Sequence, residues 1–237
     1  MANPWSVLLT CEHAGNIIPA AYRALFRHHH RLLESHRGWD PGALAIARAI
    51  EKQLDVPLMM STVSRLVVDL NRAPTSPTLL SKFTTSLSDQ EKETLLERYY
   101  RPHHLRIHRW VTHKINRGAR VLHIAVHSFT PVFKGVRRTT DIGLLYDTTR
   151  APELKIAGVW EHKLRVLGPR LHIHHNQPYS GKDDGLPTHL RQLHAGQCYA
   201  GFEIEVNQRF ARSGAQKLQR ITDIITASVE QTLAALT

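Results

Sequence analysis

Short apolar runs alternate with longer amphipathic segments along most of the chain. Apolar runs bounded by turn-forming residues are typical of buried strands, and the sequence contains six of them. The predicted strands are Ser6–Thr10, Val56–Met60, Val121–Val126, Ile142–Tyr146, Arg170–His174 and Tyr199–Val206. Apolar residues that recur at helical spacing indicate helices with one buried face. The predicted helices are Pro41–Leu54, Asp89–Asn116, Glu153–Leu167 and the stretch from Leu218 to Leu236.

The order of these elements predicts the fold class. Strands that alternate with helices form a parallel or mixed sheet that is covered by helices on both faces. We therefore expect a three-layer α/β/α architecture with a central mixed, mainly parallel sheet. No internal repeat or long linker divides the sequence, so we treat residues 1–237 as one domain. Pro102 should kink or split the helix in which it lies, and the Pro-, Ser- and Thr-rich stretch Ala73–Ser88 should form a surface loop over a cleft.

The composition is that of a globular protein with a sizeable core. Of the 237 residues, 42% are hydrophobic and 22% are charged, which argues against a collagen-like, coiled-coil or disordered chain. Cys11 and Cys198 are too few for a disulfide scaffold, and a reducing compartment is expected. The N-terminus contains neither a basic signal-peptide region nor a membrane span, so we expect a cytoplasmic protein without membrane association.

The charge balance favours anionic partners. Lysine and arginine exceed aspartate and glutamate by 11, and small carboxylates, acidic lipids and nucleic acids are all attracted by a positive surface. The basic residues are scattered through periodic segments, and neither a zinc-finger spacing nor an aromatic RNA-binding motif is present. We therefore expect a small anionic ligand and no nucleic acid.

Three polar residues occupy positions where a sheet of this kind binds ligands. His13 follows the first predicted strand, Asp40 precedes the first predicted helix, and His127 follows the strand Val121–Val126. Two imidazoles and one carboxylate with a free fourth position are a usual ligand set of catalytic zinc. Separations of 27 and 87 residues form no local motif. A loop histidine, a helix N-cap and a strand-end histidine are therefore the alternative interpretation.

Two glutamates lie on a late strand that is otherwise apolar. Glu203 and Glu205 are two positions apart, so both side chains point to the same face of the strand. Two neighbouring buried acids require a cation, a metal ion or a catalytic role, and their repulsion raises one pKa toward the range of a general base. The alternative is the wet face of an edge strand, on which the acids pair with arginines.

Arginines flank another acidic position. Arg65 and Arg72 lie on either side of Asp69. An arginine in a cleft binds a carboxylate through two parallel hydrogen bonds, whereas an Arg–Asp pair that only holds the loop is the alternative. Arg138, which lies close to Asp141, is open to the same two interpretations.

Six short segments form a recognisable series along the chain. They are Cys11–Pro19, Gly38–Ala43, Ser64–Arg72, His127–Pro131, Asn176–Tyr179 and Glu203–Gln208. In this order, over about residues 6 to 210, the series resembles the N-formylglutamate amidohydrolase family. The resemblance implies a fold and a chemistry like those of zinc-dependent carboxypeptidases, acylglutamate deacylases and cell-wall amidases.

The resemblance also implies roles for individual residues. His13, Asp40 and His127 would be the ligands of one zinc ion, Glu205 the general base, and His194 a histidine near the reacting group. The residues expected to bind the substrate are Arg65, Asn71, Arg72, Arg138 and Tyr179.

Two positions depart from the family pattern. Related deacylases take their first two ligands from a His-x-x-Glu pair, but Asn16 stands three residues after His13 in this chain. Asp40 is therefore the expected second ligand, and Glu12 is the alternative. Glu12 also stands where members associated with N-formylglutamate have a proline, so the resemblance specifies the reaction class more closely than the substrate.

The reaction implied is hydrolysis of the amide bond of an N-acyl amino acid, with N-formyl-L-glutamate giving formate and L-glutamate as the leading case. A zinc amidase that acts on another acylated amino acid or on a peptidoglycan stem is the first alternative. A non-catalytic basic protein that binds anions or nucleic acid is an alternative of a different class.

Overall fold

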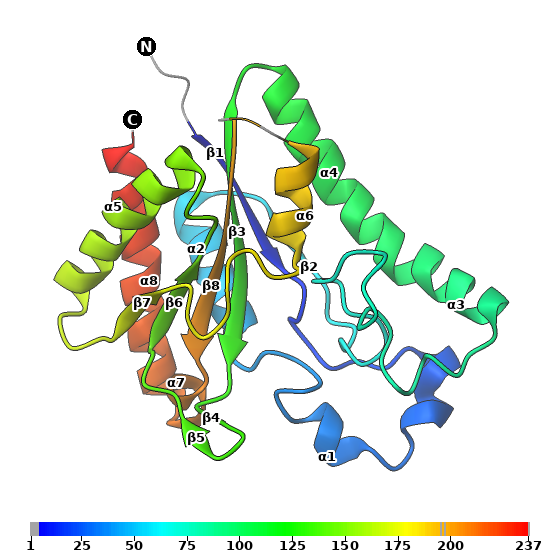
Figure 1. The fold of residues 1–237 in the computed structure, drawn as a ribbon. Coiled ribbons are helices and arrows are strands. Elements are labelled where there is room, and N and C mark those ends of the chain that lie inside the picture. Colours follow the sequence, from blue (N-terminus) through cyan, green and yellow to red (C-terminus); the bar gives the residue numbers. More distant parts are fainter. Residues whose placement is uncertain (1–4, 195, 197, 237) are drawn as a thin grey trace.

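A six-stranded sheet forms the centre of the computed structural model, which describes residues 5–194, 196 and 198–236 (Figure 1). Its strands are, in spatial order, β2 (Leu58–Met60), β1 (Trp5–Cys11), β3 (Arg120–Phe129), β8 (Tyr199–Asn207), β6 (Ile142–Leu145) and β7 (Ile173–His175). The first four are parallel to one another, whereas β6 pairs antiparallel with β8 and parallel with β7. The sheet is therefore mixed and mainly parallel, as the sequence predicts, and each predicted strand overlaps one of its members.

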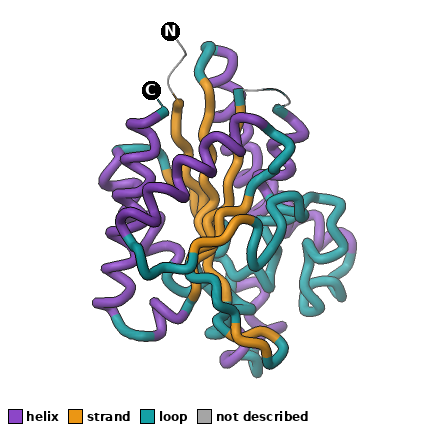
Figure 2. The backbone as a smooth tube through the Cα atoms, turned by 60° about the vertical axis from the view of Figure 1, so that its left-hand side comes forward, coloured by secondary structure: helices purple, strands orange, loops and turns teal. Residues whose placement is uncertain are grey.

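Helices cover both faces of this sheet (Figure 2). One face packs against α2 (Ala43–Leu54), α5 (Ala151–Leu167) and α8 (Ala215–Ala235), and the other packs against α4 (Arg101–Asn116) and α6 (Leu186–Leu193). Successive residues of β1 alternate between these layers, because Val7 and Leu9 pack with the first group and Leu8 with the second. The expected three-layer α/β/α architecture is confirmed. No helix in the described part of the chain has the length and the apolar character needed to cross a bilayer.

The helical stretch around Pro102 is not split. α3 (Asp89–Leu95) begins at a capping box formed by Ser88 and Glu91. One π-helical turn, η2 (Leu96–Tyr100), then leads directly into α4, whose first turn contains Pro102. Proline has no N–H to donate, and the missing donor falls where the hydrogen-bond pattern changes from π to α.

A second apolar cluster lies beside the sheet. Its buried members come from η1 (Ala20–Phe26), the stretch that joins β2 to α3, and the α3–η2 helix, and they are Tyr22, Phe26, Leu66, Val67, Val68, Leu70, Leu79, Leu95 and Tyr100. The stretch Ala73–Ser88 is thus more than the surface loop predicted from its composition. Leu79 is buried, and Thr84 donates a hydrogen bond to the carbonyl of Val67 over 3.0 Å. The nine buried residues named above are called the satellite cluster below. Four of them, Leu66, Val67, Val68 and Leu70, belong to the segment 64–72, so the cluster anchors that segment.

The remaining elements are short. They are α1 (His30–Leu33), α7 (Arg209–Arg212) and a hairpin of β4 (Val132–Phe133) and β5 (Val136–Arg137). Because β1, β3 and β8 are parallel, their carboxyl ends meet at one edge of the sheet. Ligand sites of open α/β sheets lie at that edge.

Candidate metal centre

Three of the predicted residues meet at the carboxyl ends of β1 and β3. His13 follows β1, Asp40 lies in the loop before α2, and His127 belongs to β3. One ligand atom from each lies within 4.8 Å of the other two, and all three residues are buried. Oδ2 of Asp40 is 2.9 Å from Nδ1 of His127 and 3.4 Å from Nδ1 of His13. Nitrogen and oxygen ligands that each lie about 2 Å from a shared zinc ion have separations of this order.

The carboxylate of Asp40 faces the two histidines and not the helix that follows it. The residue before α2 is Gly42, with a φ of 89°, and no side chain caps that helix. Asp40 accepts a hydrogen bond from the backbone N–H of Ser128 over 3.3 Å and another from Arg65 over 3.2 Å. Burial opposes the charged form of Asp40, but the positive charge of Arg65 and the contacts with the histidines outweigh burial and hold its pKa below the ordinary value. Asp40 is therefore an anionic group that faces the two histidines and not a helix cap.

A carboxylate lies behind each histidine. Nε2 of His13 is 2.6 Å from Oδ1 of Asp69, and Nε2 of His127 is 3.1 Å from Oε2 of Glu12. A carboxylate on the outer nitrogen fixes the orientation of the ring and directs the other nitrogen toward a metal. Since Glu12 contacts the outer nitrogen of His127, the geometry favours Asp40 over Glu12 as the second ligand.

Glu12 is enclosed by a further histidine. Its second oxygen is 3.7 Å from Nε2 of His103 on α4, and the carboxylate is fully buried. Burial would raise the pKa of Glu12, but His103 and His127 outweigh burial and hold it well below the ordinary value. No sequence pattern pointed to His103, because it is joined to this site only by the packing of α4. For Asp69 the one available signal was its place inside a segment that resembles the family.

The polar atoms of this cluster fit a bound cation. Within the described residues, Nδ1 of His13, which faces Asp40, has no hydrogen-bond partner and is shielded from solvent. Buried polar groups without a partner are costly, and an ion or a water molecule normally satisfies them. Two imidazoles and one carboxylate are also the donor types that zinc takes when it keeps an open position.

Glu205 lies directly beside the candidate metal centre of His13, Asp40 and His127. It is opposite His127 in the β3–β8 register, and β8 lies inside the sheet between β3 and β6, which excludes the wet edge strand considered from the sequence. The side chain is 6% exposed, and its Oε2 atom has no hydrogen-bond partner among the described residues. Burial raises the pKa of Glu205 to about 8, helped by the negative charges of Asp40 and Glu203 and opposed by His127. A carboxyl group with such a pKa can take up and release a proton near neutral pH.

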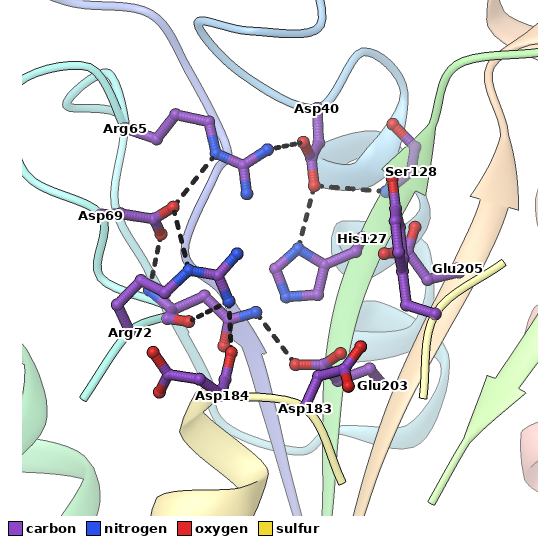
Figure 3. A pocket seen from close by; sticks show the side chains of 12 residues that line it. Asp40, Arg65, Asp69, Arg72, His127, Ser128, Asp183, Asp184, Glu203 and Glu205 are labelled. Atoms are coloured by element: carbon purple, nitrogen blue, oxygen red, sulfur yellow. Dashed lines mark hydrogen bonds and ion pairs between the residues drawn. The ribbon is translucent and has the colours of Figure 1, made fainter. Parts of the chain in front are cut away.

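These groups open onto one cavity of about 240 Å³ (Figure 3). Its walls come from the metal centre, the segment 64–72, the loop before α6 and β8. The lining residues are Asp40, Arg65, Asp69, Asn71, Arg72, His127, Ser128, Tyr179, Asp183, Asp184, Glu203 and Glu205. The structure thus brings Arg65, Asn71, Arg72 and Tyr179, four of the residues expected to bind substrate, to one cavity with the metal centre.

Arg65 and Arg72 combine the two roles considered for them. Their Nε atoms lie 3.6 Å and 4.0 Å from Oδ2 of Asp69, so both guanidinium groups are held by that carboxylate. Figure 3 shows that one terminal nitrogen of each group makes no marked contact and points toward the space near His127. The pair is therefore anchored by Asp69 and still offers donors to an anion.

The family follows from the sequence match. The family model described as N-formylglutamate amidohydrolase matches residues 5–211. This chain belongs to that family. Membership makes the chain a hydrolase that acts on amides.

Two solved structures resemble this amidohydrolase over nearly its whole length. The gene product Atu2144 from Agrobacterium tumefaciens is 29% identical, with a TM-score of 0.83 and coverage of 99% of this chain and 93% of that chain. The N-formylglutamate amidohydrolase from Ralstonia eutropha JMP134 is 18% identical, with a TM-score of 0.71 and coverage of 98% and 93%. At that identity the second likeness shows the fold alone. A comparison with curated proteins found no match.

Arg138 of this amidohydrolase packs against Tyr179, one of the cavity residues. Its guanidinium carbon is 4.7 Å from the ring centroid of Phe133 and 5.1 Å from that of Tyr179, and it donates a hydrogen bond to the Tyr179 hydroxyl over 3.3 Å. Arg138 is not itself among the lining residues and contacts the cavity through Tyr179. It makes no pair with Asp141, which bonds Arg209 instead.

His194 is the predicted catalytic residue that the structure places elsewhere. α6 begins beside the cavity, where the N–H of Leu186 donates to Oδ1 of Asn71 over 2.7 Å, and His194 follows the last turn of that helix. At about 1.5 Å per residue the helix carries its end well away from the cavity. The His194 ring stacks on His108 with centroids 5.3 Å apart and lies near Tyr199 at the amino end of β8. Contrary to the prediction, His194 is not brought to the reacting groups.

Proposed function

We propose that this amidohydrolase is metal-dependent and cleaves the amide bond of a small N-acyl amino acid, with one zinc ion per chain. N-formyl-L-glutamate, which would give formate and L-glutamate, is the reference substrate. The observation that carries the proposal is the placement of Glu205 beside the cluster of His13, Asp40 and His127, with Asp40, His127 and Glu205 lining one small cavity. A cavity of about 240 Å³ suits a substrate of the size of a single acylated amino acid.

The chain's own residues would then divide the reaction among them. When held by His13, Asp40 and His127, a zinc ion supplies Lewis acidity, which makes a carbonyl group more reactive and a water molecule more acidic. Glu205 accepts the proton of the attacking water as the new carbon–oxygen bond forms. It then passes this proton to the nitrogen of the amide, so that the carbon–nitrogen bond breaks and the amine leaves with both the electron pair and the proton.

Other residues that line the cavity would orient the substrate. The free terminal nitrogens of Arg65 and Arg72 can take a carboxylate of the substrate through charge-assisted hydrogen bonds. Asn71 and Tyr179 line the same space and can bond the acylated amide. Asp69 keeps both guanidinium groups in place, so less side-chain freedom is lost when the substrate binds.

The substitution Glu205→Gln tests this proposal. It keeps the size of the side chain but removes the proton acceptor, so kcat for an N-formyl amino acid should fall by about 10²–10⁴. The metal content, measured by elemental analysis of protein purified without added metal, should stay near that of the unaltered chain. Glu230→Gln, an exposed position on α8, is the matched control and should leave both values unchanged.

Two results would contradict the proposal. Full turnover by Glu205→Gln with metal still bound would show that another group is the base. A metal-free protein that hydrolyses no N-acyl amino acid, and whose affinity for anions falls steeply with added salt, would instead support a binding protein.

A further inference from the structure

The cavity has an acidic wall that the proposed reaction does not use. Asp183 and Asp184 contribute to it from the loop before α6, and Glu203 contributes from β8 (Figure 3). Six carboxylates and two arginines line the cavity altogether. The two arginines are already paired with Asp40 and Asp69, and Arg72 also donates a hydrogen bond to the backbone carbonyl of Asp184. Among the described residues, neither arginine forms an ion pair with a carboxylate of the acidic wall.

The acidic wall is held by neutral donors only. Asp183 accepts from the N–H of Ser180 over 3.1 Å, Asp184 from the N–H of Ala73 over 2.9 Å, and Glu203 from Nδ2 of Asn71 over 2.9 Å. Among the described residues no lysine, arginine or histidine lies within 4.0 Å of these three carboxylates, and the second oxygen of each has no hydrogen-bond partner.

A second observation points to a ligand in the same space. Oε2 of Glu205 is buried, faces the cavity and has no hydrogen-bond partner within the described residues. The acidic wall therefore shares one cavity with a buried carboxylate oxygen that still lacks a partner.

These charges fit a dianionic substrate poorly. Arg65 and Arg72 offer free donors for one carboxylate, but a second carboxylate on the substrate side chain would face the acidic wall. Like charges a few ångströms apart repel by about 1 kcal/mol in water and by several times more in a partly closed cavity. Arg138 is not among the residues that line the cavity, and its guanidinium group is packed against the rings of Phe133 and Tyr179.

We infer that Asp183, Asp184 and Glu203 make this enzyme prefer N-acyl amino acids whose side chain carries a positive charge. The inference rests on the proposed function and specifies its substrate class. The substrate carboxylate binds Arg65 and Arg72, the scissile amide lies at the metal centre, and an ammonium or guanidinium group at the end of the side chain pairs with the acidic wall. The net positive charge of the whole chain, +11, does not report the local charge of this cavity.

Three substrates of similar length test the inference. They are Nα-formyl-L-lysine, the neutral Nα-formyl-L-glutamine and the dianionic Nα-formyl-L-glutamate. We expect kcat/KM to fall in that order by about tenfold per step, the change that about 1.4 kcal/mol produces. A higher kcat/KM for the glutamate derivative than for the lysine derivative would overturn the inference.

Charge-neutral variants test which carboxylates cause the preference for a positively charged side chain. Asp183→Asn is at an exposed position and should not affect folding, and Glu203→Gln keeps an oxygen that can accept from Asn71. Each should reduce the lysine-to-glutamine ratio of kcat/KM by about threefold to tenfold, an effect of about 1 kcal/mol. Asp223→Asn, an exposed acid on α8, is the control and should leave the ratio unchanged. An unchanged ratio in both cavity variants would overturn the inference.

A binding measurement separates this inference from the proposed reaction. Calorimetry with the free amino acids L-lysine and L-glutamate needs no turnover, and L-lysine should bind about tenfold or more tightly. If no formylated substrate is hydrolysed but L-lysine still binds better and loses this advantage in Asp183→Asn, the reaction is wrong and the inference stands. If formylated substrates are hydrolysed but L-glutamate binds better, the inference is wrong and the reaction stands.

Discussion

Two histidines of β3, four residues apart, are both buried and yet have opposite environments. In the middle of the strand, His123 lies between the hydroxyl groups of Thr10 and Tyr199, each at 2.8 Å. At the carboxyl end, His127 lies between the carboxylates of Asp40 and Glu12.

The pKa values of the two rings follow these partners. Burial lowers the pKa of His123 to about 4, because its neutral partners do little for a positive ring. Burial acts in the same direction on His127, but its hydrogen bonds with Asp40 and Glu12 outweigh burial and raise its pKa well above the ordinary value. The charge of the partners, and not burial or residue type, therefore separates a structural histidine from a candidate ligand.

Removal of each ring in turn tests the difference between the two histidines. We expect His127→Ala to lose nearly all bound metal and to lower kcat by about 10³-fold or more, since a metal ion contributes several kcal/mol to such reactions. His123→Gln should keep its metal but lose about 1–3 kcal/mol of unfolding free energy, because buried hydroxyl groups lose a partner. Elemental analysis and urea unfolding measure the two effects, and equal metal loss in both variants would contradict the distinction.

The carboxylates that contact the outer nitrogens of His13 and His127 provide a second test, with a smaller expected effect. Glu12→Gln and Asp69→Asn remove the charges behind the two candidate ligands while keeping their shapes, and should weaken metal binding by about 10–100-fold. Competition with a chelator of known affinity measures this change. Thr10→Val removes the neutral partner of His123 and is the control, since the metal affinity should stay the same. A loss of affinity in Thr10→Val as large as in Glu12→Gln would refute the role given to the outer carboxylates.

The pH dependence of the unfolding free energy provides the third test. The pKa of His123 is about 4 in the folded chain and 6.5 without the fold, so between these values only the unfolded chain binds the proton. The stabilisation from a neutral His123 is complete above about pH 6.5 and is lost progressively as the pH falls toward 4. At pH 5 this loss is about 2 kcal/mol, at about 1.4 kcal/mol per pH unit.

Urea unfolding at pH 7 and pH 5 measures this loss. His123→Gln should show a pH 7-to-5 difference smaller by that amount, whereas His113→Gln, at an exposed position of α4, should match the unaltered chain. The same pH dependence in all three proteins would mean that His123 is not the titrating group.

The sequence predicted the sheet and the ligand candidates because both depend on local patterns. Apolar runs predicted the six strands, and the ends of those strands pointed to His13 and His127. The sequence could not predict contacts between distant segments. Asp69 lies 56 residues from His13 in the sequence, and only the fold brings its carboxylate to the outer nitrogen of that ring. The location of His194 could not be predicted for the same reason. Its position shortly before β8 in the sequence does not determine the direction in which α6 runs.

The satellite cluster anchors the expected substrate-binding residues outside the sheet. The ligand candidates and Glu205 are fixed by the sheet, whereas Arg65, Asn71 and Arg72 stand on a segment whose apolar anchors, such as Leu70, pack outside the sheet core. The same segment carries Asp69, whose Oδ1 lies 2.6 Å from Nε2 of His13. A mutation that displaces this segment therefore changes the substrate contacts and the orientation of one candidate ligand together, so substrate preference and hydrolysis are coupled in this fold.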